Sequence, residues 1–442
     1  MKFEHVRGFR DQYPEDYEPR EVIFRTASKA ARLFGYRHVD VPSVEYLDLY
    51  RVKSGDELVS QTFAFKDRGG REVTLIPEVT PSVVRMIASR KDLPRPVRWF
   101  SFPKVWRYEE PQSGRLREHF QFNADLFGAK GPAADAEVIG LAAHILDRLG
   151  LEGQYEVRVN NRKLMDSFLT GVGVKDIAGA FSVIDRFRKT SREEFLDGLE
   201  ATGVDRSTAV SIAEVLSQRI SFDDVEERVS SIMGRSETVT EIVRELREMR
   251  KLISCFTRSP VVMDLSIVRG LSYYTGTVFE AFDTAGELRA ILGGGRYDSL
   301  GELLAGIDLP AVGFGMGDVV IEILMRRVGA WRVEKKEPKF YVCIASSMFQ
   351  EEAFSVAAEI RKSGGSAVCE VSERSLSAQL KSASSEGCDF AVILGEREIE
   401  AGGVTIRDLA SGEQVSVMRV DLPRYVAERA ASLHGRGQGK IY

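Results

Sequence analysis

The sequence predicts an α+β protein in which an antiparallel-sheet domain contains a helical insertion and is followed by a separate α/β domain. Three observations lead to this prediction. Two extended runs with a polar loop between them occupy residues 97–128, as in an antiparallel pair. From about 165 to 255, charged residues are interleaved with apolar ones at helical spacing. Beyond residue 338, strand-like and helix-like segments alternate, which is typical of α/β structure.

The composition is that of an ordinary globular protein, with 43% hydrophobic and 29% charged residues in a chain of 442. The formal net charge of −5 neither indicates nor excludes nucleic-acid binding, because local basic patches matter more than the total. No apolar run approaches the ~20 residues of a membrane span, and the charged N-terminus lacks a signal-peptide core, so a cytoplasmic protein is expected. The four cysteines lack CxxC spacing, which favours free thiols over a metal or redox site.

The elements before the insertion are predicted from periodicity and from glycine and proline positions. The apolar residues of 20–34 share one helical face, and Gly35 can end that helix. An extended segment follows at 39–45, where Pro42 indicates an edge or a bend. The longer elements are strands over 97–109 and 118–128, joined by the basic loop 110–117, and a helix over 132–149.

After the insertion, extended and glycine-rich sequence returns at 262–317, and Asp318 is placed to cap a helix that runs to about Arg327. The C-terminal part predicts, in order, a strand over 339–345, a helix over 349–363, a strand over 366–371, a helix over 375–386, a strand over 389–395, a hairpin near Gly402 and Gly403, and a helix over 421–433. The predicted division is a sheet domain in two parts, 1–164 and 256–330, the insertion 165–255 between them, a linker 331–338, the α/β domain 339–433 and a tail 434–442.

Polar residues alternate along the predicted strand 118–128. Gln121, Asn123 and Asp125 share one face, and aromatic and aliphatic residues share the other. A solvated strand face is the simpler interpretation of this row taken alone. Arg107 and Glu109 also share a face of the neighbouring strand, however, and Arg115 and Arg117 lie at the connecting loop. Acid, amide and guanidinium groups on adjacent strands suit a ligand with both ammonium and phosphate parts.

Three further segments carry candidate residues. Glu78 and Thr80 alternate like strand residues and can offer a carboxylate and a hydroxyl to an ammonium group, although Thr80 is equally well placed to cap a helix. Tyr273 and Tyr274 form a pair for which core packing is the usual explanation. The run Gly293-Gly294-Gly295 weakens a strand unless something must approach it closely, and it lacks the lysine and spacing of a Walker loop.

These residues favour chemistry at a phosphate rather than acyl transfer on a serine. The sequence has no Gly-x-Ser-x-Gly elbow and no metal-hydrolase spacing, and its five histidines are scattered. A carboxylate that attacks the α-phosphate of a nucleotide is already ionised. Catalysis of that step comes from positioning and from neutralisation of the phosphate charge, which arginines and Mg²⁺ provide.

Taken in order, the segments resemble class II aminoacyl-tRNA synthetases, and specifically the histidyl-tRNA synthetase family. Residues 35–42 with Glu45 resemble the first class II motif, which builds the dimer interface. The C-terminal domain resembles the anticodon-binding module of the same enzymes. The second motif is matched by 106–109, 114–118 and 120–121, the start of the third by 312–317, and two segments peculiar to the histidine enzyme by 268–280 and 293–298.

The resemblance implies a role for each candidate. Arg107 is expected to hold the α-phosphate and the substrate carboxylate, and Arg269 to lie opposite it across the reacting phosphorus. Glu109 is expected to face the adenine, Arg115 to reach the ATP phosphates, and Arg296 to help to hold ATP. The remaining expectations are Glu78, Thr80 and Asp125 at the histidine ammonium, Gln121 near its carboxylate, Tyr273 and Tyr274 around its imidazole, and Gln112 at the tRNA acceptor end.

The implied reaction joins L-histidine to tRNA(His) through a histidyl-adenylate, with Mg²⁺ accompanying ATP and a homodimer as the assembly. The sequence departs from the family where the third motif usually continues to an arginine, because Val320 stands in that position. Val79 also replaces the glycine usual after Glu78. The Val320 departure leaves open an alternative, a synthetase-like regulatory subunit of ATP phosphoribosyltransferase that binds histidine without charging tRNA. The second-motif arginines, Arg269 and the C-terminal module favour the enzyme.

Overall fold

The computed structural model describes residues 3–51, 59–90, 92–268, 273–332 and 337–437. The chain divides into two compact units, Met1–Arg332 and Val333–Tyr442, and each is described by itself. No helix among the described residues is long and apolar enough to cross a membrane.

The first unit is built on a mainly antiparallel sheet, as predicted. Among the strands that the structure describes, only the two edge pairs are parallel, β1 (Arg37–His38) with β5 (Val97–Ser101) and β8 (Tyr155–Asn161) with β9 (Val261–Met263). A short ninth strand of the described residues, β6 (Lys104–Trp106), pairs with the first three residues of β7 (Glu118–Phe127). Among the described residues the other strands run in the order β1 (Arg37–His38), β5 (Val97–Ser101), β7 (Glu118–Phe127), β12 (Ala311–Gly317), β11 (Leu292–Arg296), β10 (Thr277–Asp283), β8 (Tyr155–Asn161) and β9 (Val261–Met263).

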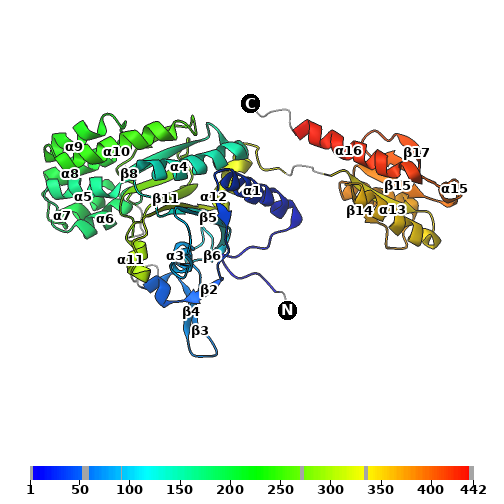
Figure 1. Cartoon of the computed structure of the whole chain (residues 1–442), viewed down its shortest axis with the longest axis horizontal. Coiled ribbons are helices and arrows are strands. Elements are labelled where there is room, and N and C mark those ends of the chain that lie inside the picture. The colour runs from blue at the N-terminus through cyan, green and yellow to red at the C-terminus, as the bar shows by residue number, and fades with distance from the viewer. Residues whose placement is uncertain (1–2, 52–58, 91, 269–272, 333–336, 438–442) are drawn as a thin grey trace. The chain divides into compact units, whose positions relative to one another are not determined.

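Helices cover one face of this sheet (Figure 1). Phe122 and Ala124 of β7 are fully buried against them, in one core with the apolar face of α1. The apolar face of α1 carries apolar residues that were predicted for the first helix. The helix begins at Pro14, earlier than the predicted residue 20. The covering helices are α1 (Pro14–Leu33), α4 (Pro132–Leu146) and α12 (Asp318–Arg327).

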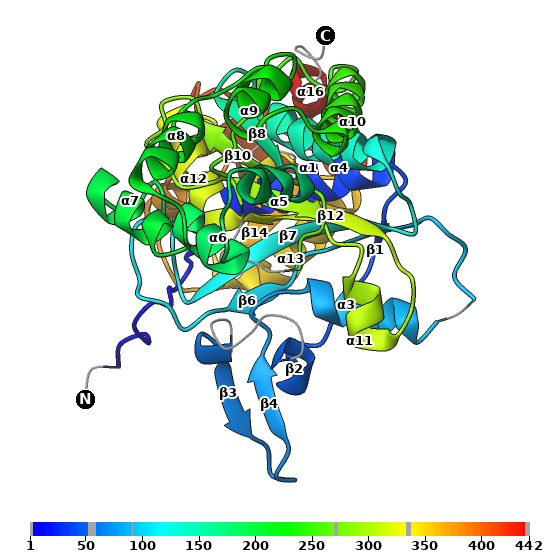
Figure 2. The same cartoon turned by 90° about the vertical axis from the view of Figure 1, so that its left-hand side faces the viewer.

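The opposite side of the sheet carries smaller elements (Figure 2). They are a three-stranded sheet of β2 (Val44–Tyr46), β4 (Glu72–Leu75) and β3 (Phe63–Lys66), with the helices α3 (Thr80–Ala88) and α11 (Leu300–Ala305). The predicted strand 97–109 is interrupted between β5 and β6, because Pro103 has no N–H to donate to the ladder. Arg107 and Glu109 therefore lie beyond the end of β6 in irregular chain, and not on a strand as predicted.

The segment predicted to be a helical insertion is helical. Its first four helices begin at side-chain caps: the side chains of Asn161, Asp176, Ser191 and Asp205 each accept a backbone N–H of the first turn. The last helix of the insertion, α10 (Glu237–Ile253), packs against α4 of the sheet domain. Among the described residues the helices are α5 (Arg162–Gly171), α6 (Ile177–Asp185), α7 (Arg192–Glu200), α8 (Arg206–Leu216), α9 (Val225–Met233) and α10 (Glu237–Ile253).

The second unit has the predicted α/β pattern. Its sheet order is β14-β13-β15-β16-β17, in which the first three strands are parallel and the last two antiparallel. The hairpin between β16 and β17 turns at 409–413, later than the predicted Gly402 and Gly403. The elements are β13 (Lys339–Ile344), α13 (Gln350–Lys362), β14 (Ser366–Cys369), α14 (Leu376–Ser385), β15 (Phe390–Leu394), α15 (Glu396–Glu400), β16 (Gly403–Asp408), β17 (Gln414–Met418) and α16 (Leu422–Gly437). All four cysteines of the chain are free, as expected.

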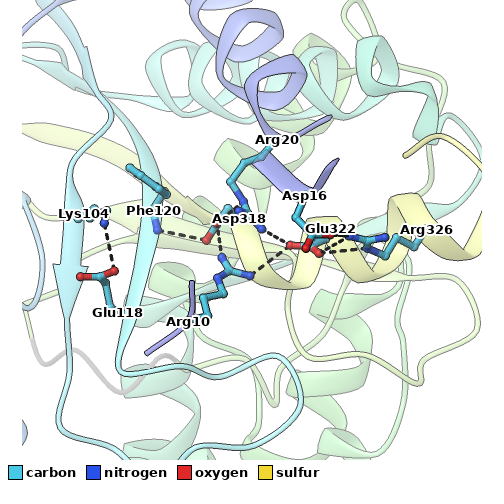
Figure 3. A network of polar contacts seen from close by, with 9 residues as sticks. All are labelled: Arg10, Asp16, Arg20, Lys104, Glu118, Phe120, Asp318, Glu322 and Arg326. Carbon is cyan, nitrogen blue, oxygen red and sulfur yellow. Dashed lines mark hydrogen bonds and ion pairs between the residues drawn. The ribbon is translucent and has the colours of Figure 1, made fainter. Parts of the chain in front are cut away.

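A buried ion network joins the N-terminal segment to α1, β7 and α12 (Figure 3). Asp318, whose side chain is 1% exposed, accepts hydrogen bonds from Arg10 Nη2 at 2.6 Å and from the backbone N–H of Phe120 at 3.1 Å, and it forms an ion pair with Arg20 Nε at 2.8 Å. Glu322 on the next turn pairs with both arginines and with Arg326. Asp318 is thus the first residue of α12, and its carboxylate binds these groups rather than capping the helix as predicted.

This network predicts a large difference between two arginines that share Glu322. We expect Arg20→Met to lower the free energy of unfolding by about 3 kcal/mol, because it leaves a buried carboxylate without one of its partners. Arg326→Met is the matched control: its side chain is 45% exposed, so we expect a loss of about 1 kcal/mol or less. Urea unfolding of the two variants measures both values, and equal losses would contradict a stabilising role for the buried network.

Candidate active site

The polar row of β7 lies on the sheet face that α1 and α4 leave uncovered. Its odd-numbered residues Gln121, Asn123 and Asp125 point away from the helices, since the even-numbered residues form the core. Gln121 Nε2 donates to Asn123 Oδ1 at 2.9 Å, which fixes the orientation of both amides. The alternation predicted from sequence is therefore the one that the strand adopts.

The neighbouring strand β12 offers this row a floor without side chains. Gly313 lies opposite Asp125, and Gly315 lies opposite Asn123. A Cβ on Gly315 would lie 2.7 Å from Gln121 Nε2, and one on Gly313 would overlap the Asp125 carboxylate. The next strand continues the floor, because Gly293 and Gly295 of β11 lie opposite the same two glycines. Glycine is required here because the polar side chains of β7 lean over β12.

Two buried carboxylates at one end of the floor each receive a tyrosine hydroxyl. Tyr273 donates to Glu78 Oε2 at 3.3 Å, and Tyr297 donates to Asp125 Oδ1. Both carboxylate residues are 4% exposed. The Tyr273 ring lies 4.7 Å from that of Tyr274 and 5.6 Å from that of Tyr297, centroid to centroid. Residues from four separate segments of the chain therefore meet in one aromatic and acidic corner.

Electrostatics keep these tyrosines protonated. Burial, reinforced by the Glu78 carboxylate, raises the pKa of Tyr273 well above its ordinary value. Burial and the Asp125 carboxylate do the same to the pKa of Tyr297. A buried carboxylate is stabilised by hydrogen-bond donors and by positive charge. The corner therefore suits a cationic ligand such as an ammonium group.

Arginines gather at the other end of the site. Arg107 Nε donates to the carbonyl oxygen of Pro77 at 2.9 Å, directly before Glu78 in the chain. Arg115 pairs with Glu109 through Nε and Nη2. Burial lowers the pKa of Arg115, and so do the nearby charges of Arg289 and Arg107. The charges of Arg107 and Arg289 thus both act on Arg115, and a cluster of arginines is suited to binding phosphates.

The comparisons with known proteins identify the family. A model of histidyl-tRNA synthetase matches residues 8–317, and a model of an anticodon binding domain matches residues 339–429. This chain belongs to the histidyl-tRNA synthetase family. It is 51% identical over 422 residues to the histidine–tRNA ligase of Thermoplasma volcanium, covering 96% of this chain and 98% of that protein. It is 50% identical to the corresponding ligase of Picrophilus torridus, covering 95% and 98%.

Solved structures confirm the fold class. The crystal structure of histidyl-tRNA synthetase from Nostoc sp. PCC 7120 is similar with a TM-score of 0.82 at 24% identity, covering 97% of this chain and 100% of that one. A structure described as an ATP phosphoribosyltransferase regulatory subunit/histidyl-tRNA synthetase from Bacillus halodurans is similar with a TM-score of 0.72 at 24% identity, covering 89% and 98%. The fold alone therefore does not separate the synthetase from its regulatory relative.

Two of the residues expected from the histidyl-tRNA synthetase resemblance lie in other settings than predicted. Residues 76–79 are irregular chain, so Glu78 and Thr80 do not alternate along a strand. Thr80 is the buried first residue of α3 and makes no capping hydrogen bond; Val79 holds the cap position.

The Gln112 side chain is exposed, and its backbone pairs with that of Arg115 across the loop tip. Arg269 lies outside the described residues.

The expectation that Arg296 helps to hold ATP does not agree with its contacts. Its guanidinium group binds Asp135 at 2.6 Å and 2.9 Å, Asp298 at 3.0 Å, and the carbonyl oxygens of Ala129 and Gly131. These bonds occupy all five N–H donors of an arginine, which leaves none for a phosphate. Arg296 instead ties β11 to the start of α4.

Three site residues escaped the sequence prediction. Strand alternation could have predicted Tyr297. If Gly293 and Gly295 face the site, Tyr297 faces it too, and Arg296 faces the helices. His119 extends the row of Gln121 by the same rule, and a Cβ on Gly317 would lie 3.5 Å from its ring. Arg289 had no such signal, because it lies far from the other site residues in the chain.

His119 predicts a specific pH dependence of stability. Partial burial, and then the charge of Arg107, lower the pKa of His119 to about 3. The unfolded chain, with a histidine pKa of ~6.5, therefore binds this proton first as the pH falls. The imidazole thus makes the free energy of unfolding decrease from about pH 6.5 downwards. We expect His119→Phe to lose stability less steeply than the parent between pH 6.5 and 5, as measured by urea unfolding. Parallel profiles would refute the lowered pKa.

Proposed function

We propose that this chain is a histidine–tRNA ligase. It would activate L-histidine with ATP to give histidyl-adenylate and pyrophosphate, and then transfer the histidyl group to tRNA(His) with release of AMP. The observation that carries the proposal is the division of one glycine-floored sheet face into an acidic, tyrosine-lined corner and an arginine-rich end. The two relatives that are about half identical to nearly the whole chain, both named histidine–tRNA ligase, support it.

The acidic corner would bind the amino acid. Glu78 and Asp125 supply negative charge to the histidine ammonium, with Thr80 at the adjacent start of α3. The rings of Tyr273 and Tyr274 flank the imidazole, and Tyr297, which donates to Asp125, joins them. Gln121, held by Asn123, would approach the histidine carboxylate. Hydrogen-bonded sites of this kind reject analogues that leave their buried groups unpaired.

Arg107 lies at the junction of the two ends, since it is anchored to Pro77 next to Glu78. A cation there would hold the histidine carboxylate against the α-phosphate and stabilise charge as the carboxylate oxygen attacks phosphorus and pyrophosphate leaves. Arg269 would face Arg107 across that phosphorus; this role rests on the resemblance alone.

The arginine-rich end would bind ATP. Glu109 would bind the adenine and Arg115 the phosphates, so their mutual ion pair must open when ATP enters. Mg²⁺ would arrive on the ATP phosphates and neutralise part of their charge. No group of three or more histidine, cysteine or acidic side chains that could hold a metal occurs in the described part of the chain.

The remaining assignments follow the family. The unit that matches an anticodon-binding domain would bind the anticodon of tRNA(His), and the exposed Gln112 would meet the acceptor end. We propose the same domain division as the sequence predicts, a homodimer built through residues 35–45, and a cytoplasmic location.

Histidine-dependent exchange of pyrophosphate into ATP, followed by charging of tRNA(His), tests the proposal. Exchange and charging are the expected results. A folded protein that binds histidine but catalyses neither reaction would instead match the regulatory-subunit alternative.

Tyr273→Phe tests the acidic corner. We expect the KM for histidine in the exchange assay to rise about tenfold or more, because Glu78 loses a neutral donor that orients it, while the KM for ATP changes little. Tyr341→Phe, which removes a buried hydroxyl from Glu370 in the other unit, is the matched control and should leave both constants unchanged. An unaltered KM for histidine in the Tyr273 variant would remove this residue from the pocket.

A further inference from the structure

The helix that follows β12 brings no cation to the arginine-rich end. Val320, in its first turn, is buried, and a Cβ on Gly114 of the 110–117 loop would lie 3.4 Å from Val320 Cγ2. The acidic residues of the same helix, Asp318 and Glu322, are held by Arg10 and Arg20 (Figure 3). At Gly114, α12 therefore presents an apolar side chain to the loop.

A different segment reaches the same glycine. The Cδ atom of Arg289, in the loop between β10 and β11, would lie 3.8 Å from a Cβ on Gly114. Arg289 and Val320 thus border one point of the 110–117 loop, the residue next to Arg115. Gly114 itself has φ +76°, a left-handed conformation that favours glycine and keeps this point free of a side chain.

The backbone on either side of Arg289 is fixed. The buried Asp283 carboxylate accepts the N–H of Leu288 at 2.9 Å, one residue before it. Ile291, two residues after it, donates its N–H to Ala281 O at 2.8 Å. The side chain of Arg289 therefore leaves from a defined position, although the residue is exposed.

The charges near Arg289 are not balanced. Glu287, its nearest acidic residue in the chain, pairs with Arg327 at 2.8 Å. In the part of the chain that the structure describes, Arg289 itself forms no ion pair with a carboxylate. Its charge lowers the pKa of Arg115, as does that of Arg107, and Glu109 is the carboxylate that pairs with Arg115. Such a cluster stabilises a polyanion that enters it.

We propose that Arg289 binds the polyphosphate of ATP from the β10–β11 loop, opposite Arg115. Arg289 places a positive charge beside Gly114, where α12 contributes the apolar side chain of Val320. This inference rests on the proposed function and deepens it, because it assigns the grip on the nucleotide that the missing third-motif arginine leaves unexplained.

Arg289→Ala tests the assignment. In the pyrophosphate-exchange assay we expect the KM for ATP to rise roughly 10-fold to 100-fold, as for the loss of one charge-assisted phosphate contact, with the KM for histidine changed less than twofold. Arg289→Lys should lie in between, because it keeps the charge but loses the forked geometry. Arg327→Ala removes another exposed arginine, the last residue of α12, and is the matched control.

A transplanted arginine makes the test sharper. Because Val320 and Arg289 border the same glycine, the double variant Arg289→Ala with Val320→Arg should recover part of the lost ATP affinity. Isothermal titration of the full chain with MgATP gives that affinity without turnover, so it decides the matter even if the parent catalyses no exchange, which would be a failure of the proposed function. An unchanged KM and Kd for ATP in Arg289→Ala, or an equal loss in Arg327→Ala, would overturn the assignment.

Discussion

The register between β7 and β12 is the constraint on which the site depends. It sets Asp125 against Gly313 and Asn123 against Gly315, so that each large polar side chain meets a residue without one. A slip of one residue would send the polar row into the helix-covered core and bring the phenylalanines to the surface. The burial of Phe122 and Ala124 on the other face therefore enforces the position of every polar group on this face.

On this floor, buried carboxylates lie at one end and arginines at the other. Glu78 and Asp125 are buried, and tyrosine hydroxyls with raised pKa values donate to them without bringing positive charge. At the other end, Arg115 has a carboxylate partner in Glu109. Both ends thus remain partly compensated when empty, which limits the cost of burying them. Each gains most when a ligand of the complementary charge arrives.

The sequence predicts the part of this arrangement that depends on strand period. The polar row on β7 and the glycines of β11 that continue its floor follow from alternation alone. The same rule assigns Tyr297 to the site and Arg296 to α4, where the guanidinium group of Arg296 binds Asp135. Pro103 explains why one predicted strand is two. What no local pattern predicts is contact between distant segments, such as Arg289 beside Gly114 or Arg10 beside Asp318.

The ion network at α12 explains why a cation for ATP suits the β10–β11 loop better than this helix. The first turn of a helix favours negative charge, and Asp318 there, buried between Arg10 and Arg20, satisfies both the helix and the two arginines. An arginine at position 320 would add positive charge to that turn, against the helix dipole. Val320 avoids this conflict and packs against the loop at Gly114. Arg289 approaches the same glycine from a segment whose own acidic residues are already bonded, so its charge stays available to the nucleotide.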